Sequence, residues 1–283
     1  MSDLCPVLIT ADAELAARAE RVGVGRIMVD LERIGKFERQ KFRDTWISKH
    51  RIEDIAPVAA ALSRADLMVR INPLHEGSAE EIDQAIGEGA RTIMLPMFRT
   101  IEEVETVGVM IAGRCRFVPL VETAQAMAVL EDVARSPRVD ETFIGLNDLH
   151  ISLGLDFMFE PLADGMLEEA SAALRAIGKP FGFGGIARIG EGDLPAEFIL
   201  REHARLGSTR VNLSRTFARE GEPSGRAISD DTSVLEREVG RVLHLYDRAR
   251  LASAEEKAQN TQALREKIDM IVTRIRANRG EAK

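Results

Sequence analysis

Short apolar runs alternate with longer amphipathic stretches from residue 6 to about residue 217, and this alternation limits the possible folds more than any other feature. Repeated strand–helix units are typical of a parallel sheet covered by helices, the α/β class. Eight runs read as strands: 7–10, 26–32, 67–72, 92–97, 116–122, 142–148, 181–187 and 209–214. Eight units predict a closed (β/α)8 TIM barrel, because an open doubly wound sheet more often has about five or six strands.

The segments around the predicted strands support a barrel rather than a dinucleotide-binding fold. Ala11-Asp12-Ala13 follows the first predicted strand, where a Rossmann fold would carry a G-x-G-x-x-G turn. Amphipathic helix-like stretches separate the strands: 12–21, 52–63, 78–88, 100–112, 124–134, 165–177 and 195–206. We therefore expect an outer ring of helices.

The character of the chain changes near residue 220, and we predict a barrel core over 1–219, a loop over 220–231 and C-terminal helices over 232–283. Two apolar stripes of helical spacing run through the last segment: Leu235, Val239, Val242 and Tyr246, then Leu264, Ile268, Ile271 and Ile275. The second stripe belongs to an extension beyond the last barrel helix. It fits docking on the chain's own barrel and, equally well, a seam with a partner subunit.

Composition excludes some classes of function. The formal net charge is −8, whereas a general nucleic-acid binder needs a basic surface. All apolar runs are short, and the N-terminus does not read as a secretory signal, so we expect no membrane contact and a cytoplasmic location. Cys5 and Cys115 lack metal-ligand spacing and are expected to be buried thiols.

Two carboxylates follow neighbouring apolar runs at the end of the barrel that usually holds the active site. Glu122 follows the run 117–121, and Asp148 follows the run 143–147. Two carboxylates in a partly buried mouth repel each other unless they share a cation or a proton. Mg²⁺ or Mn²⁺ suits oxygen ligands, while the absence of His or Cys at these positions argues against Zn²⁺. The alternative is that each carboxylate caps a helix or pairs with an arginine.

Arg70 ends the third predicted strand and would project a cation toward the same mouth. A guanidinium presents two parallel N–H donors, which suits recognition of a small carboxylic acid. The alternative is an ion pair with Asp30 or Glu32, which end the second predicted strand.

Four strand-end motifs occur in order along the chain: VRINP at 69–73, MLPM at 94–97, LVETA at 120–124 and IGLNDL at 144–149. Together they resemble the HpcH/HpaI aldolase and citrate lyase β-subunit superfamily, over about residues 6–217. The resemblance implies a metal-dependent carbon–carbon lyase on a phosphoenolpyruvate/pyruvate-type barrel. The implied substrate is a small anionic 2-oxo acid or 2-hydroxy acid, converted through a metal-stabilised enolate. A homo-oligomer, either a trimer or a hexamer, is also implied.

The resemblance assigns roles to the residues in these motifs. It implies that Glu122 and Asp148 bind Mg²⁺ (or Mn²⁺) and that Arg70 binds the carboxylate of pyruvate or its equivalent. Further substrate-binding positions in the same motifs are Thr123, Gly145 and Asn147.

The second strand departs from the aldolase pattern. The pyruvate aldolases have D-G-E-H there, with a histidine that helps to move protons, whereas this chain has Asp30-Leu31-Glu32-Arg33. Asp30 and Glu32 remain catalytic candidates, and His50 is the candidate replacement base, since an ordinary histidine titrates near pH 6.5. The D-L-E sequence also fits an acyl-CoA lyase or thioesterase of the citrate lyase or malyl-CoA type, acting on a CoA thioester. A non-catalytic binding or assembly subunit is the third hypothesis.

Overall fold

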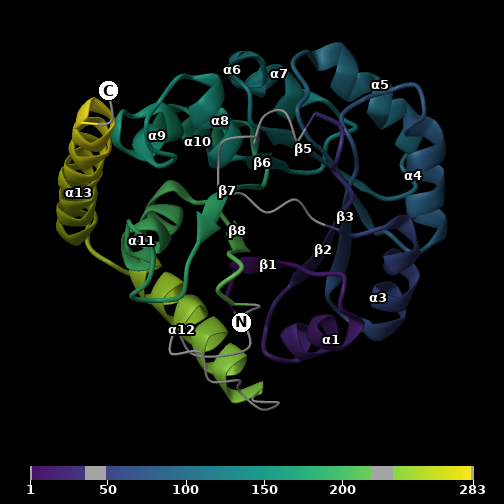
Figure 1. Ribbon diagram of the computed structural model, residues 1–283, viewed down its shortest axis with the longest axis horizontal. Helices are drawn as coiled ribbons and strands as arrows, with labels where there is room; N and C mark the ends of the chain where they lie inside the picture. Colours follow the sequence, from purple (N-terminus) through teal and green to yellow (C-terminus); the bar gives the residue numbers. More distant parts are fainter. Residues whose placement is uncertain (1, 36–48, 218–231, 282–283) are drawn as a thin grey trace.

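The computed structural model describes residues 2–35, 49–217 and 232–281. Eight parallel strands close into a barrel in chain order, and β8 pairs with β1 (Figure 1). The strands are β1 Cys5–Ile9, β2 Arg26–Asp30, β3 Asp66–Arg70, β4 Thr92–Leu95, β5 Arg116–Val121, β6 Thr142–Ile144, β7 Phe181–Ile186 and β8 Arg210–Leu213. The predicted TIM barrel is therefore confirmed.

The helices of the outer ring lie close to the predicted stretches: α1 Ala13–Arg21, η1 Ile52–Asp54, α3 Ile55–Ala61, α4 Ser78–Gly87, α5 Ile101–Ile111, α6 Ala124–Ala128, α7 Leu130–Arg135, α10 Met166–Ile177 and α11 Ala196–Leu206. Local capping explains several of the starts. The Asp12 side chain accepts hydrogen bonds from two backbone amides of α1, and Thr100 forms a capping box with Glu103 at α5. The predicted helix over 124–134 is divided at Val129.

The strand predicted over 142–148 is wrong at its end. β6 stops at Ile144, and the chain turns at Gly145 into α8 (Leu146–Ser152), so Asp148 lies in the first turn of a helix and not on a strand tip. The reason is that Leu146 and Leu149 are both buried, a helical spacing that a short apolar run does not distinguish from a strand. The short helix α9 (Glu160–Ala163) was not predicted either.

Two C-terminal helices pack on the outside of the barrel. α12 (Thr232–Arg250) contacts α11 and α1, and α13 (Ala254–Glu281) contacts α11 and α9 (Figure 1). Leu264, Ile268 and Ile271 of the second apolar stripe are buried against the chain's own barrel. Of the two alternatives for this stripe, docking on the same chain is the one observed. No described helix is long and apolar enough to cross a membrane.

Every second residue of a barrel strand faces the interior, and the interior is built in three layers. On β2 these residues are Arg26 at the bottom, Met28 in the middle and Asp30 at the top. The middle layer is apolar and consists mainly of Val7, Met28, Met68, Met94 and Val118, and Leu120 and Phe143 pack on it and also line the cavity above. This layer separates a charged cluster below from a charged cavity above.

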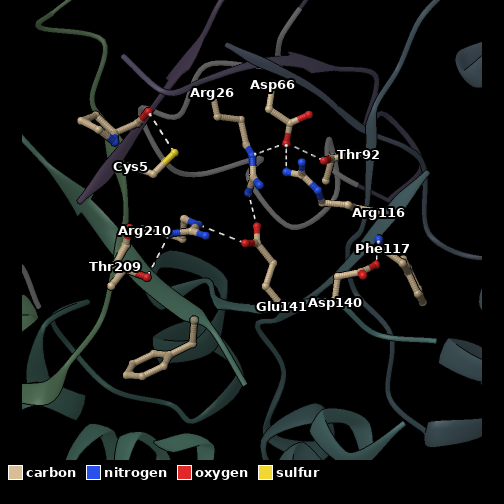
Figure 2. Close-up of polar contacts among 12 residues, drawn as sticks. Cys5, Arg26, Asp66, Thr92, Arg116, Phe117, Asp140, Glu141, Thr209 and Arg210 are labelled. Carbon is tan, nitrogen blue, oxygen red and sulfur yellow. Dashed lines mark hydrogen bonds and ion pairs between the residues drawn. The ribbon is translucent and has the colours of Figure 1, made fainter. Parts of the chain in front are cut away.

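The bottom layer is an ionic cluster of Arg26, Asp66, Glu141 and Arg210 (Figure 2). Arg26 pairs with Glu141 and donates to Asp66 at 3.0 Å, and Arg210 donates to Glu141 at 3.0 Å. The cluster occupies the N-terminal end of the barrel interior. Nearby Cys5, like Cys115, is a free thiol; both were expected to be buried, and both are only partly buried.

Candidate active site at the barrel mouth

A cavity of about 430 Å³ lies at the C-terminal ends of the strands. Its polar lining comes from the ends of β2, β3, β5 and β8, from α8 and from the segment before η1: Asp30, His50, Arg70, Glu122, Asn147, Asp148, Asn212, Ser214 and Arg215. Gly145, Gly184 and Gly185 form the wall on the side of β6 and β7. The predicted residues Asp30, Arg70, Glu122 and Asp148 are thus brought together around one space, as barrel topology requires.

Glu122 is buried, with 3% of its surface exposed. Burial raises the pKa of its carboxyl group well above the ordinary value, Asp148 and Glu32 raise it further, and Arg70 acts in the opposite direction. Its Oε1 accepts a hydrogen bond of 3.0 Å from the backbone N–H of Met97. The site therefore concentrates negative charge where little water can screen it.

Met97 is a contributor that the sequence reasoning left without a role. Its backbone has a φ of 57°, the left-handed region that non-glycine residues rarely occupy. In this conformation its N–H meets the Glu122 carboxylate. The signal was present in the MLPM motif at 94–97, but a motif does not reveal a backbone hydrogen bond.

Gly145 provides the space that Glu122 occupies. A Cβ atom at position 145 would lie 2.9 Å from both Cβ and Oε2 of Glu122. Any other residue would therefore displace the carboxylate. This close approach to Glu122 explains why a glycine stands at this position.

Arg70 forms a bidentate ion pair with Asp30. Its Nε donates to Oδ1 at 2.8 Å, its Nη2 donates to Oδ2 at 2.7 Å, and Nη1 lies 3.6 Å from Glu32 Oε2. Burial alone would lower the pKa of Arg70, but Asp30, Glu32 and Glu122 raise it, so the guanidinium stays charged. The ion pair named as the alternative is present. It holds the Arg70 guanidinium in a fixed orientation at the wall of the cavity.

His50 reaches the same cavity from a distant part of the sequence. The Asp30 backbone N–H donates to His50 Nδ1 at 3.0 Å, and Arg33 Nη2 donates to the His50 carbonyl oxygen at 2.8 Å. The intervening residues 36–48 lie outside the described part of the chain.

Two predicted site residues do not line the cavity. Thr123 is the N-cap of α6: its hydroxyl accepts from the Ala126 N–H at 3.0 Å and donates to the Phe98 carbonyl oxygen at 3.1 Å. Glu32 is buried behind Arg70. Both are therefore placed to support neighbouring residues of the site.

The carboxylates at the mouth fit a hard divalent cation. Mg²⁺ is usually held by one or two protein carboxylates together with water and substrate oxygens. Glu122 and Asp148 both line the cavity and would supply such donors. Within residues 2–35, 49–217 and 232–281 no group of three or more His, Cys, Asp or Glu forms a complete cage, so water and substrate would supply the other ligands.

Comparison with known proteins identifies the family of the chain. Residues 8–186 match the family model of the HpcH/HpaI aldolase/citrate lyase family. No curated protein sequence matches the chain. An HpcH/HpaI aldolase/citrate lyase family protein from Burkholderia cenocepacia is similar in structure, with 18% identity, a TM-score of 0.60 and coverage of 86% of this chain and 94% of the other.

Two similar structures from Mycobacterium tuberculosis contain magnesium. The citrate lyase β-subunit complexed with oxaloacetate and magnesium is 18% identical, with a TM-score of 0.57 and coverage of 86% and 96%. The protein CitE in complex with magnesium and pyruvate is 17% identical, with a TM-score of 0.56 and coverage of 92% and 98%. At this identity the structures establish the fold, and the family model establishes the family. The chain belongs to the HpcH/HpaI aldolase/citrate lyase family of metal-dependent carbon–carbon lyases.

Proposed function

We propose that this protein is a divalent-metal-dependent lyase that makes or breaks a carbon–carbon bond next to the oxo group of a small 2-oxo acid. One observation carries the proposal: the buried carboxylate of Glu122 faces the charge of Asp148 and Glu32 at the mouth of the barrel. A bound cation would remove this repulsion.

Glu122 and Asp148 are the proposed ligands of Mg²⁺ or Mn²⁺. When bound, the metal would act as a Lewis acid toward the oxygen atoms of the substrate. Oxaloacetate and pyruvate accompany magnesium in the two relatives from M. tuberculosis, which supports a 2-oxo acid as the substrate class here.

Arg70 is the proposed partner of the substrate carboxylate. Asp30 and Glu32 hold its guanidinium in one orientation, so little side-chain freedom is lost when an anion binds. Gly145 and Asn147, which line the cavity, are proposed to contact the substrate as well.

Metal binding and enolisation test the proposal separately. Calorimetry with Mg²⁺ and Mn²⁺ should show binding that is lost in Glu122→Gln and Asp148→Asn but kept in Asp83→Asn, a matched change at an exposed position. Proton NMR should show metal-dependent deuterium exchange at the methyl group of pyruvate. Unchanged metal affinity in both site variants, or no exchange in the wild type, would overturn the proposal.

An acyl-CoA lyase or thioesterase is the second candidate, and the sequence Asp30-Leu31-Glu32 supports it. A panel of free acids and CoA esters distinguishes the two. Turnover of free 2-oxo acids without any response to CoA esters would exclude the second candidate. Metal-dependent exchange of pyruvate would also argue against a purely binding or assembly role.

A further inference from the structure

A backbone hydrogen bond determines which ring nitrogen of His50 carries the hydrogen. A peptide N–H can only donate, so the 3.0 Å bond from Asp30 N–H requires a lone pair on His50 Nδ1. In the neutral ring the single hydrogen must then be on Nε2. His50 therefore carries a hydrogen-bond donor, and not a free base, on the side of the ring away from Asp30.

A charged ring would lose the contact between His50 Nδ1 and the Asp30 backbone. A second proton would have to be added at Nδ1, directly against the Asp30 N–H. Both carboxylate oxygens of Asp30 accept hydrogen bonds from Arg70, and Oδ1 also accepts from the Glu32 backbone N–H at 3.2 Å. Asp30 thus contacts His50 through its backbone N–H, while its carboxylate is paired with Arg70.

Arg33 fixes the backbone of His50. Its Nη2 donates to the His50 carbonyl oxygen at 2.8 Å. The Arg33 peptide is itself fixed, because its N–H and that of Ile34 donate to Asn72 Oδ1 at 2.8 and 3.0 Å. Arg33 stands where the pyruvate aldolases carry a histidine. Here it contacts His50, a histidine from later in the chain.

We infer that His50 is a neutral Nε2–H donor to the substrate oxygen that gains negative charge during carbon–carbon bond formation, and that Arg33 is its positioning residue. This inference rests on the proposed function. The enolate carbon of the 2-oxo acid attacks the carbonyl carbon of a second substrate, and the carbonyl π electrons move to its oxygen. His50 donates a hydrogen bond to that oxygen and keeps its proton, while water supplies the proton that completes the hydroxyl group. In this role His50 is a hydrogen-bond donor, whereas the sequence alone suggested a base.

NMR of the wild-type protein tests the tautomer without any activity. A two-bond ¹H–¹⁵N spectrum at neutral pH should show a neutral His50 ring with its hydrogen on Nε2. The chain has five histidines, and His50→Gln assigns the signal by its loss. A ring with hydrogen on Nδ1, or a charged ring, would overturn the inference even if the proposed lyase activity were present.

Kinetics separate a donor from a base. His50→Ala should lower the rate of bond formation with pyruvate and the best of a panel of small aldehydes by about 10²-fold, the usual loss for one oxyanion donor. Pyruvate methyl exchange should fall by less than about tenfold, because that step creates no charge on the second oxygen. His50→Gln, whose amide also donates, should restore most of the bond-forming rate. His244→Gln, on an exposed part of α12, is the control.

Several outcomes would contradict the donor role. Equal losses of exchange and bond formation in His50→Ala, or a Gln variant as slow as Ala, would indicate a base. Failure of the wild type on every aldehyde, with exchange intact, would exclude donation to a second carbonyl oxygen. Absence of exchange in the wild type would instead overturn the proposed function and leave the tautomer result standing. Arg33→Leu should lower the bond-forming rate less than His50→Ala does, and its NMR spectrum should show more than one environment for the His50 ring. Arg33→Lys should partly restore the rate and the single environment. A single, unchanged His50 environment in Arg33→Leu would refute the positioning role.

Discussion

The backbone N–H of Met97 donates a 3.0 Å hydrogen bond to Oε1 of Glu122, and Met97 adopts a φ of 57° where it does so. A left-handed conformation costs a non-glycine residue about 1–2 kcal/mol, and such strain is found mainly at functional sites. The strain is therefore associated with a contact that orients the proposed metal ligand.

Met97→Val should lower the free energy of unfolding by about 1–2 kcal/mol or more, because a β-branched residue tolerates this φ poorly. It should also weaken Mg²⁺ binding. Met97→Gly keeps the N–H and accepts the conformation, so it should retain metal affinity. Urea unfolding and calorimetry measure the two effects; equal metal affinity in all three proteins would disconnect Met97 from the site.

Gly145→Ala should displace Glu122, since the new Cβ would lie 2.9 Å from its Cβ and Oε2. The φ of Gly145 is −86°, so any loss reflects space and not backbone strain. We expect Mg²⁺ affinity to fall by about tenfold or more, equivalent to about 1.4 kcal/mol. The control is Gly240→Ala in α12, where a Cβ meets nothing within 4 Å. That change should leave metal binding intact, and equal metal binding in both variants would contradict the packing argument.

His203 should make stability depend on pH. It is fully buried, stacked on Phe183 with ring centroids 3.7 Å apart, and burial lowers its pKa from 6.5 to about 3. Between these values the unfolded chain binds the proton and the folded chain does not. The stability present above pH 6.5 therefore falls as the pH decreases toward 3, by up to about 1.4 kcal/mol per pH unit. Urea unfolding near neutrality and in mild acid should show a smaller slope for His203→Gln and an unchanged slope for His244→Gln.

Glu141 should be essential to the ionic cluster at the bottom of the barrel. It is buried and accepts from both Arg26 and Arg210 (Figure 2). Glu141→Gln removes the negative charge between two guanidinium groups and should reduce the free energy of unfolding by about 3–5 kcal/mol. Glu131→Gln breaks an exposed pair on α7 and should change it by less than about 1 kcal/mol. Similar unfolding midpoints for the two variants would show that the cluster contributes little.

The barrel and the charged residues at the centre of its mouth were predictable from local sequence patterns. Alternating apolar runs and amphipathic stretches identified eight strands. The ends of the third and fifth strands placed Arg70 and Glu122 at the mouth, because parallel strands bring their ends to one side. The apolar run after residue 142 misled the prediction, since a short buried run fits a strand or a helix equally well.

The sequence by itself determined the architecture and the charge at the mouth, because both follow from periodicity along the chain. Only the tertiary structure decided which side chains pair with one another. Arg26 and Glu141 are 115 residues apart, Asp30 and Arg70 are 40 apart, and the side chain of His50 meets the backbone of Asp30 across 20 residues. Such contacts depend on how strands align around a closed barrel, which no local spacing encodes. For the same reason, the ring nitrogen of His50 that bears the hydrogen became apparent only from the folded chain.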